Sequence, residues 1–234
     1  ARRGNTRPGR ARSHGRVTGS LAVRMVVARS AAEMPVVTWR FASMDTVNAV
    51  PKFDVFSAPM RGIGSSSTRS AVTGRQMINS YSTLANDGGM MRPYVVDRIV
   101  SSTGETVFKA RPEVLGRPVR PEVAKAVREM LVGVTEEGGT GKRASVPGYS
   151  VAGKTGTAQK AVPGGYSSTD YYASFVGFVP AFEPVFSVLV SVERPRPQHT
   201  GGYVSAPVFA KIATATARYL EIEPDLPPES EMPF

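Results

Sequence analysis

Hydrophobic and polar residues follow a regular pattern only from about residue 70 onward. In residues 73–86 apolar side chains recur at the three- to four-residue spacing of an amphipathic helix. Thr73 is placed to cap the first turn of this helix, and Gly88-Gly89 is placed to end it. The predicted buried face consists of Met77, Ile78, Tyr81, Leu84 and Ala85.

Two further helices follow from the same spacing. Pro121 suits the first position of a helix that runs to about Glu137. Its expected buried stripe is Val123, Val127, Met130, Leu131 and Val134. The last helix is expected to start with Ser205 as its N-cap and Pro207 in its first turn. Its expected inward face is Val208, Phe209, Ile212, Thr216 and Leu220.

Strand patterns separate these helices. Residues 94–100 and 105–110 are predicted as strands joined by the Ser102-Thr103-Gly104 turn. Further strands are predicted at 150–157, 172–179 and 185–192. Strands joined by short turns favour an antiparallel sheet with helices packed on it, so the predicted fold class is α+β.

The first 70 residues differ in composition from the rest. Residues 1–32 hold eight arginines and no Lys, Asp or Glu, so the net charge of +10 leaves only 10 − 8 = +2 for the remaining chain. Such an arm could contact nucleic acid or anionic lipid through phosphate groups. No aromatic residue is interleaved among these arginines, which argues against nucleic-acid binding. The alternative is a tail without a binding role.

Composition limits the remaining classes. There is no Cys and there are two His, so neither disulfides nor a Cys- or His-rich metal site is expected, and no cofactor is expected. No apolar run approaches the ~18–20 residues that span a bilayer, so any membrane anchor is expected outside this chain.

The segment Val151–Gln159 carries the sharpest candidate chemistry. On a strand Thr155 and Thr157 share a face, whereas Lys154 points to the other, although a bulge or twist would change this. Two hydroxyls on one face can bind a carboxylate, and Gly156 would let a ligand backbone approach the strand. Lys154 adds positive charge. Taken alone, the segment is more often an exposed surface strand with a Lys and two threonines.

This segment resembles the Lys-Thr-Gly box, the third signature of penicillin-binding proteins and serine β-lactamases. The flanking text resembles the septal class B penicillin-binding proteins. The segments that carry this resemblance are Val72–Gly89, Met91–Val96, Gly138–Ala144, Tyr171–Pro180 and Gly201–Phe209. It covers roughly residues 71–225, which would be the C-terminal part of the transpeptidase domain, with 226–234 as a loose tail.

The resemblance implies a fold and an activity. Members form a serine acyl-enzyme with peptidoglycan stem peptides ending in D-Ala-D-Ala and then cross-link them, and β-lactams trap the same serine. By carry-over, Lys154 belongs to the third motif, and Thr155, Gly156 and Thr157 would hold the substrate carboxylate. The Thr157 backbone N–H would be an oxyanion-hole donor, a group whose loss costs about 2.7–4 kcal/mol. The implied location is the outer face of the cytoplasmic membrane, with cell-division membrane proteins as partners.

Two signatures of that family are missing. No Lys follows a Ser at the Ser-x-x-Lys spacing, and no Asn follows a Ser at the Ser-x-Asn spacing; Thr46-Val47-Asn48 is the nearest approach. The nucleophile is therefore not identified, and the chain is expected to be an inactive fragment of a septal transpeptidase. Alternatives are a non-enzymatic pseudo-transpeptidase that binds a ligand, or a serine β-lactamase relative, which residues 71–96 and 171–209 disfavour. Residues 1–70 are read as a fragment end, a shifted reading frame or a divergent domain.

Overall fold

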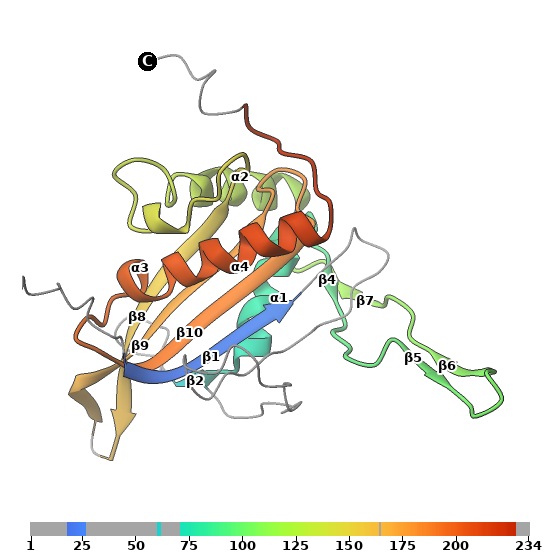
Figure 1. The fold of residues 1–234 in the computed structure, drawn as a ribbon, viewed down its shortest axis with the longest axis horizontal. Helices are drawn as coiled ribbons and strands as arrows, with labels where there is room; N and C mark the ends of the chain where they lie inside the picture. Colours follow the sequence, from blue (N-terminus) through green and yellow to red (C-terminus); the bar gives the residue numbers. More distant parts are fainter. Residues whose placement is uncertain (1–17, 27–59, 62–70, 164, 228–234) are drawn as a thin grey trace, which may run out of the picture.

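A four-stranded antiparallel sheet forms the centre of the protein (Figure 1). The computed structural model describes residues 18–26, 60–61, 71–163 and 165–227. In spatial order the sheet consists of β1 (Thr18–Val26), β10 (Phe186–Arg196), β9 (Gly165–Val179) and β8 (Ala152–Val162). Helix α4 crosses one face of this sheet and helix α1 lies on the other.

The three predicted sheet strands are confirmed, and the structure extends each of them. Strand β1 was not predicted, because it lies within the Arg-rich segment, where no regular alternation is visible. It pairs with β10 through the backbone, from Thr18 opposite Arg196 to Val26 opposite Ser187. Residues 21–26 of this strand are apolar except for Arg24, but the run is short and does not alternate, so it was not recognised as a strand.

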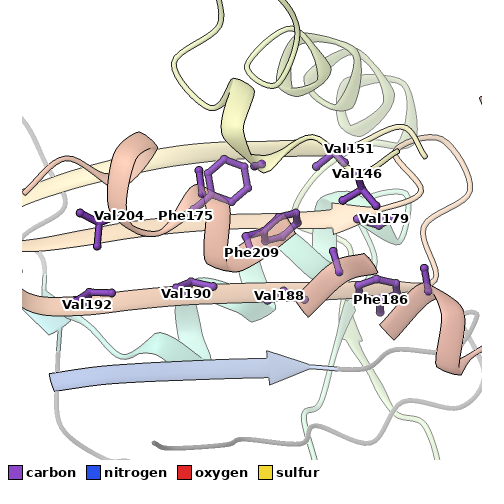
Figure 2. Packing of buried hydrophobic residues seen from close by; sticks show 14 of the residues in the cluster. Val146, Val151, Phe175, Val179, Phe186, Val188, Val190, Val192, Val204 and Phe209 are labelled. Atoms are coloured by element: carbon purple, nitrogen blue, oxygen red, sulfur yellow. The ribbon is translucent and has the colours of Figure 1, made fainter. Parts of the chain in front are cut away.

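The main core lies between the sheet and α4 (Ala206–Tyr219), which follows the short helix α3 (Gly201–Val204). Phe209 packs on Phe175 with ring centroids 4.7 Å apart and planes tilted by 58°, and both side chains are fully buried (Figure 2). Val208, Ile212, Thr216 and Leu220 line the same side, as expected. Ser205 occupies the N-cap position, but the expected capping hydrogen bond is absent. Its buried hydroxyl donates to Ala173 O at 2.9 Å instead.

On the opposite face, helix α1 (Gly74–Ala85) has the predicted start and buried side. Thr73 and Gln76 form a reciprocal capping box, in which the Thr73 hydroxyl accepts from the Gln76 N–H and the Gln76 side chain accepts from the Thr73 N–H. Ile78 is buried against Val176 and Leu189 of the sheet. The face of α1 that the apolar spacing selected is therefore the face that packs.

Helix α2 (Pro121–Val132) begins where the sequence predicts but ends earlier and buries only part of the predicted side. Met130 is 73% exposed and Val123 is 39% exposed, whereas Ala124 and Arg128 are buried. Arg128 is buried because it has partners at the C-terminal end of α1 and just after it: NH1 donates to Leu84 O at 3.0 Å and to Asp87 Oδ1 at 2.7 Å. The predicted stripe is therefore confirmed in part: Leu131 packs against the core and Val127 and Val134 are partly buried, whereas Val123 and Met130 are exposed.

Smaller elements surround this core. The predicted hairpin is confirmed in shorter form as β5 (Arg98–Val100) and β6 (Thr106–Lys109). Two short pairs were not predicted, β4 (Met90–Met91) with β7 (Val114–Gly116) and β2 (Met60–Arg61) with β3 (Ala71–Val72). The short helix η1 spans Lys142–Ala144. Within the described part of the chain, none of the helices has the length and apolar character needed to cross a bilayer.

The C-terminal segment after α4 is attached to the sheet. The Leu226 N–H donates to Gly148 O at 3.1 Å, and the Asp225 carboxylate accepts from the Ser150 backbone N–H at 2.8 Å and from the Ser150 hydroxyl. The Ser150 hydroxyl also accepts from the Ala181 N–H at 2.8 Å. The expected loose tail is thus tied down at its first residue, and 228–234 lie outside the described residues.

Candidate functional site

The residues of the Lys-Thr-Gly segment lie on β8, which pairs with β9 alone among the described strands. Thr155 lies opposite Phe175, on the side of the sheet that α4 covers, whereas Lys154 lies opposite Val176, on the side of α1. Directly opposed residues of antiparallel strands project to the same side. Thr155 and Thr157 therefore share one face and Lys154 starts from the other, as the strand period predicts.

The Lys154 side chain nevertheless reaches Thr155. Its ammonium Nζ lies 3.2 Å from both Thr155 O and Thr155 Oγ1. This path around the strand is open because β8 has no second neighbour among the described strands. The result is a positive charge beside a hydroxyl at an edge of the described sheet.

A second hydroxyl, which the sequence analysis did not single out, lies next to Thr155. Thr140 Oγ1 lies 3.1 Å from Thr155 Oγ1, and Thr140 belongs to the Gly-rich loop before η1. That loop resembles the family, but only a tertiary contact could show that its threonine meets Thr155. The two hydroxyls share one hydrogen bond, so one of their two protons remains available to an outside acceptor.

Thr157 is held by the start of helix α3. The Gly201 backbone N–H donates to Thr157 Oγ1 at 3.1 Å. The hydroxyl oxygen is therefore an acceptor in this contact, and no acceptor for its own proton lies among the described residues. Thr157 is exposed, so its O–H can donate to a bound anion.

Close packing explains the glycines at this site. A Cβ on Gly201 would lie 2.2 Å from Ser174 O and 2.5 Å from Gly156 O, so only glycine lets α3 approach the sheet this closely. A Cβ on Gly156 would lie 2.4 Å from Ser174 Oγ. The sequence explained Gly156 by the approach of a ligand, and the structure adds a protein neighbour that also requires a small residue.

Aromatic contacts flank the site on both sides. The Arg143 guanidinium lies 4.1 Å from the ring centroid of Tyr203, and the rings of Tyr171 and His199 stack with centroids 4.3 Å apart. His199 is exposed and takes part in packing. No group of three or more His, Cys, Asp or Glu side chains suited to a metal ion occurs within the described ranges.

A charged cluster lies next to Tyr171. Asp170 pairs with Arg194 at 3.0 Å and with Arg196 at 2.7 Å. The hydrogen bond from Arg196 lowers the pKa of Asp170; partial desolvation opposes this, and the positive charges of Arg194, Arg196 and Lys160 add to the lowering. Asp170 is thus held as a carboxylate.

This geometry provides one ammonium and three hydroxyls along an accessible strand edge, a donor set suited to a carboxylate. It provides no activated nucleophile, which in this chemistry needs a base within hydrogen-bond reach. Thr46-Val47-Asn48, the nearest sequence approach to the missing second signature, lies outside the described residues.

Comparison with known proteins identifies the class. Residues 45–214 match the family described as the penicillin-binding protein transpeptidase domain. Because the match includes more than half of the chain, this protein belongs to that family, and its relatives are class B penicillin-binding proteins. The match starts at residue 45, earlier than the resemblance read from the sequence.

Individual relatives agree with this assignment. The chain is 35% identical over 153 residues to the probable peptidoglycan D,D-transpeptidase PenA of Neisseria flavescens, covering 65% of this chain and 36% of the relative. It is 36% identical over 147 residues to the peptidoglycan D,D-transpeptidase FtsI of Escherichia coli, covering 59% of this chain and 25% of that protein. The structure of penicillin-binding protein 3 from Mycobacterium tuberculosis complexed with ampicillin superposes with a TM-score of 0.60 at 33% identity, covering 68% of this chain and 38% of that one. The chain therefore spans about a quarter to two fifths of these relatives.

Proposed function

We propose that residues 71–225 form the C-terminal part of a peptidoglycan D,D-transpeptidase domain and that β8 binds the carboxylate of a stem peptide ending in D-Ala-D-Ala or of a β-lactam. The observation that carries this proposal is the meeting of Lys154 Nζ, Thr155 Oγ1 and Thr140 Oγ1 at 3.1–3.2 Å on an accessible strand edge. The ampicillin complex of a relative supports the ligand class.

Each residue has a stated role in this proposal. Lys154 supplies the positive charge that attracts the carboxylate, and Thr155 donates to it with Thr140 as its hydroxyl neighbour. Thr157 donates its hydroxyl proton to the same group. Gly156 has no side chain that would block the approach of the ligand to the strand. By family resemblance, the Thr157 backbone N–H would stabilise the oxyanion of an acylation reaction.

The parent protein would cross-link peptidoglycan during septum formation, on the outer side of the cytoplasmic membrane and with cell-division membrane proteins as partners. The relatives named PenA and FtsI support this role. This chain lacks Ser-x-x-Lys, so we propose that on its own it binds the ligand without being acylated.

Intact-mass spectrometry after incubation with a fluorescent penicillin tests the absence of acylation. We expect no mass increase in the folded chain. A single penicillin adduct would mean that a nucleophilic serine exists, and peptide mapping would identify it.

Ligand-detected NMR with ampicillin tests the binding site. Wild-type chain should show saturation transfer to ampicillin, and the Thr155→Val/Thr157→Val double variant should lose it, because valine keeps the shape but removes both hydroxyls. Glu113→Gln is the matched control, since Glu113 pairs with Arg92 on an exposed surface away from β8. Equal signals from wild type and double variant would refute this site.

The absence of Ser-x-x-Lys also favours a second candidate, a pseudo-transpeptidase that keeps the fold as a binding module. The two candidates differ in the DNA that encodes residues 1–44, which precede the family match. Translation of that DNA in the other two frames should give family-like sequence if the chain derives from an active enzyme, and should not if the chain is a binding module.

A further inference from the structure

The segment that connects β10 to α3 ends in a backbone contact with the Thr157 hydroxyl. It leaves the sheet at Arg196 and enters α3 at Gly201, whose N–H donates to Thr157 Oγ1. The proposed carboxylate site depends on this contact, because it fills the acceptor side of the hydroxyl and leaves its proton for a ligand.

This contact tolerates little displacement. Gly201 lies so close to the sheet that an added Cβ would be 2.2 Å from Ser174 O. A hydrogen bond of 3.1 Å is also near the long end of the normal range, so a shift of a few tenths of an ångström would weaken it. The segment that connects β10 to α3 must therefore be fixed by contacts with residues outside α3.

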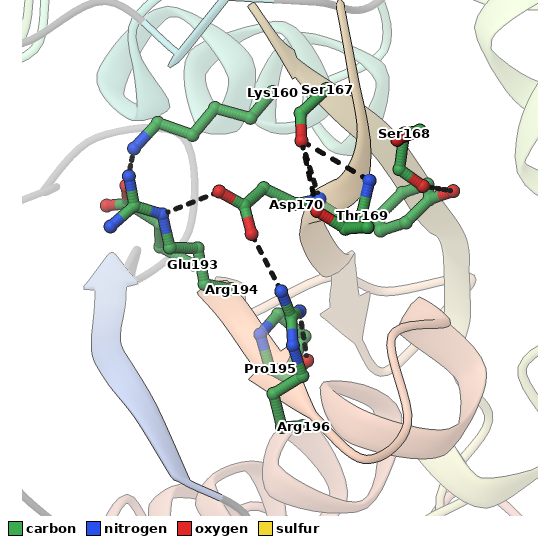
Figure 3. Close-up of polar contacts among 10 residues, drawn as sticks. Lys160, Ser167, Ser168, Thr169, Asp170, Glu193, Arg194, Pro195 and Arg196 are labelled. Atoms are coloured by element: carbon green, nitrogen blue, oxygen red, sulfur yellow. Dashed lines mark hydrogen bonds and ion pairs between the residues drawn. The ribbon is translucent and has the colours of Figure 1, made fainter.

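Asp170 holds the start of this segment (Figure 3). Its two carboxylate oxygens bind different arginines, Oδ2 to Arg194 Nε at 3.0 Å and Oδ1 to Arg196 NH2 at 2.7 Å. The backbone around Asp170 is fixed in turn, because the Asp170 N–H donates to Ser167 Oγ at 2.9 Å. The Asp170 side chain is 24% exposed and the side chains of Arg194 and Arg196 are 57% and 46% exposed, so these are partly exposed ion pairs, in which two arginines share one carboxylate.

The residue after Asp170 holds the middle of the same segment. Tyr171 stacks on His199 with the ring planes 22° apart. Neighbouring residues of β9 thus contact Arg196 and His199, which lie before Gly201 in the chain. The remaining charges make Asp170 the critical member: among the described residues, Lys160, Arg194 and Arg196 form ion pairs with Asp170 and Glu193, so removing the Asp170 charge leaves these three cations with one anion.

We propose that Asp170 is a positioning residue, which acts through Arg194 and Arg196 to keep the Gly201 amide on Thr157 and so sets the geometry of the carboxylate site. The ligand part of this inference rests on the function proposed above. Asp170 itself need not touch the ligand.

Amide exchange of the full-length, ¹⁵N-labelled chain tests the positioning directly and needs no ligand. In Asp170→Asn the Gly201 amide should exchange about fivefold faster than in wild type at pH 7, the size of effect expected for two partly exposed ion pairs. Asp170→Glu should restore much of the protection, and Arg196→Gln should reproduce the Asn variant. Glu113→Gln should leave Gly201 unchanged, although it also breaks an arginine–carboxylate pair.

Ampicillin titration of the same variants tests the consequence. Asp170→Asn should weaken binding severalfold, with the Glu variant again close to wild type, whereas thermal stability should fall only by the modest amount expected for two partly exposed ion pairs. Unchanged exchange at Gly201 in both Asp170→Asn and Arg196→Gln would overturn the positioning role, and so would faster exchange with unchanged ampicillin affinity. Faster exchange in a chain whose wild type binds no ampicillin would support the positioning of Gly201 and refute the proposed function instead.

Discussion

Replacing Gly201 with alanine gives the sharpest test of how α3 is seated on the sheet. The added methyl would lie 2.2 Å from Ser174 O, 2.5 Å from Gly156 O and 3.0 Å from Gly156 N. All three atoms belong to the backbone of paired strands, so no side-chain rotation can relieve the clash. Either α3 moves away from β8 or the strands separate.

The expected cost follows from these contacts. Overpacking of this kind costs about 1–3 kcal/mol, and loss of the hydrogen bond to Thr157 adds about 0.5–1.5 kcal/mol. Alanine is a better helix former than glycine by up to about 1 kcal/mol, which offsets part of this. We expect Gly201→Ala to lower the free energy of unfolding by about 1–3 kcal/mol and to abolish ampicillin binding.

Urea denaturation and ampicillin titration of the full chain are the assays. Gly133→Ala is the matched control, because Gly133 has helical dihedral angles and an added Cβ would meet its nearest neighbours at 3.7 and 3.8 Å. The control should be neutral or slightly stabilising. A Gly201→Ala chain as stable as the control, with wild-type ampicillin affinity, would refute the close approach of α3 to β8.

Three further changes test other parts of the structure. Arg128→Ala should cost about 2–3 kcal/mol in urea denaturation because it removes the charged hydrogen bonds to α1, whereas Arg120→Ala, which breaks an ion pair with Glu122 at an exposed site, should cost under about 0.5 kcal/mol. Equal costs for both would contradict the buried role of Arg128. Met130→Glu should change the free energy of unfolding by less than about 0.5 kcal/mol, because Met130 is 73% exposed. A large loss of stability would mean that Met130 is buried, as the sequence predicted. The pKa of Asp170 is lowered by folding, so its stabilising contribution is present above the unfolded pKa of about 3.9 and is lost as pH falls through the lower folded value. The difference in melting temperature between wild type and Asp170→Asn should therefore be constant from pH 5 to 7 and shrink below about pH 4, and a difference that persists at pH 2 would contradict the ion pairs.

Local rules predicted most of the fold. The cap at Thr73, the apolar face of α1 and the three consecutive strands follow from spacing and from residues that favour helix starts and turns. The rules failed where a tertiary partner changes the meaning of a residue. Arg128 is buried because Asp87 and Leu84 accept its hydrogen bonds. The Ser205 hydroxyl donates to a carbonyl of β9 instead of capping its own helix.

The candidate site was predictable in part. Strand alternation placed Thr155 and Thr157 on one face, and the structure agrees. Alternation could not show that Lys154 bends around the edge to Thr155, because that requires β8 to have no second neighbour among the described strands. Nor could it find Thr140, since the contact joins residues 15 positions apart through a loop whose path is set by packing.

The attachment of the C-terminal segment has a practical consequence for anyone shortening this chain. Asp225 holds Ser150, which lies two residues before β8 begins and also receives the Ala181 N–H from the turn that follows β9. A chain cut between α4 and Asp225 would still contain Lys154, Thr155 and Thr157. It would lose the carboxylate that fixes the start of their strand, so the shortest useful version of the protein extends to Leu226.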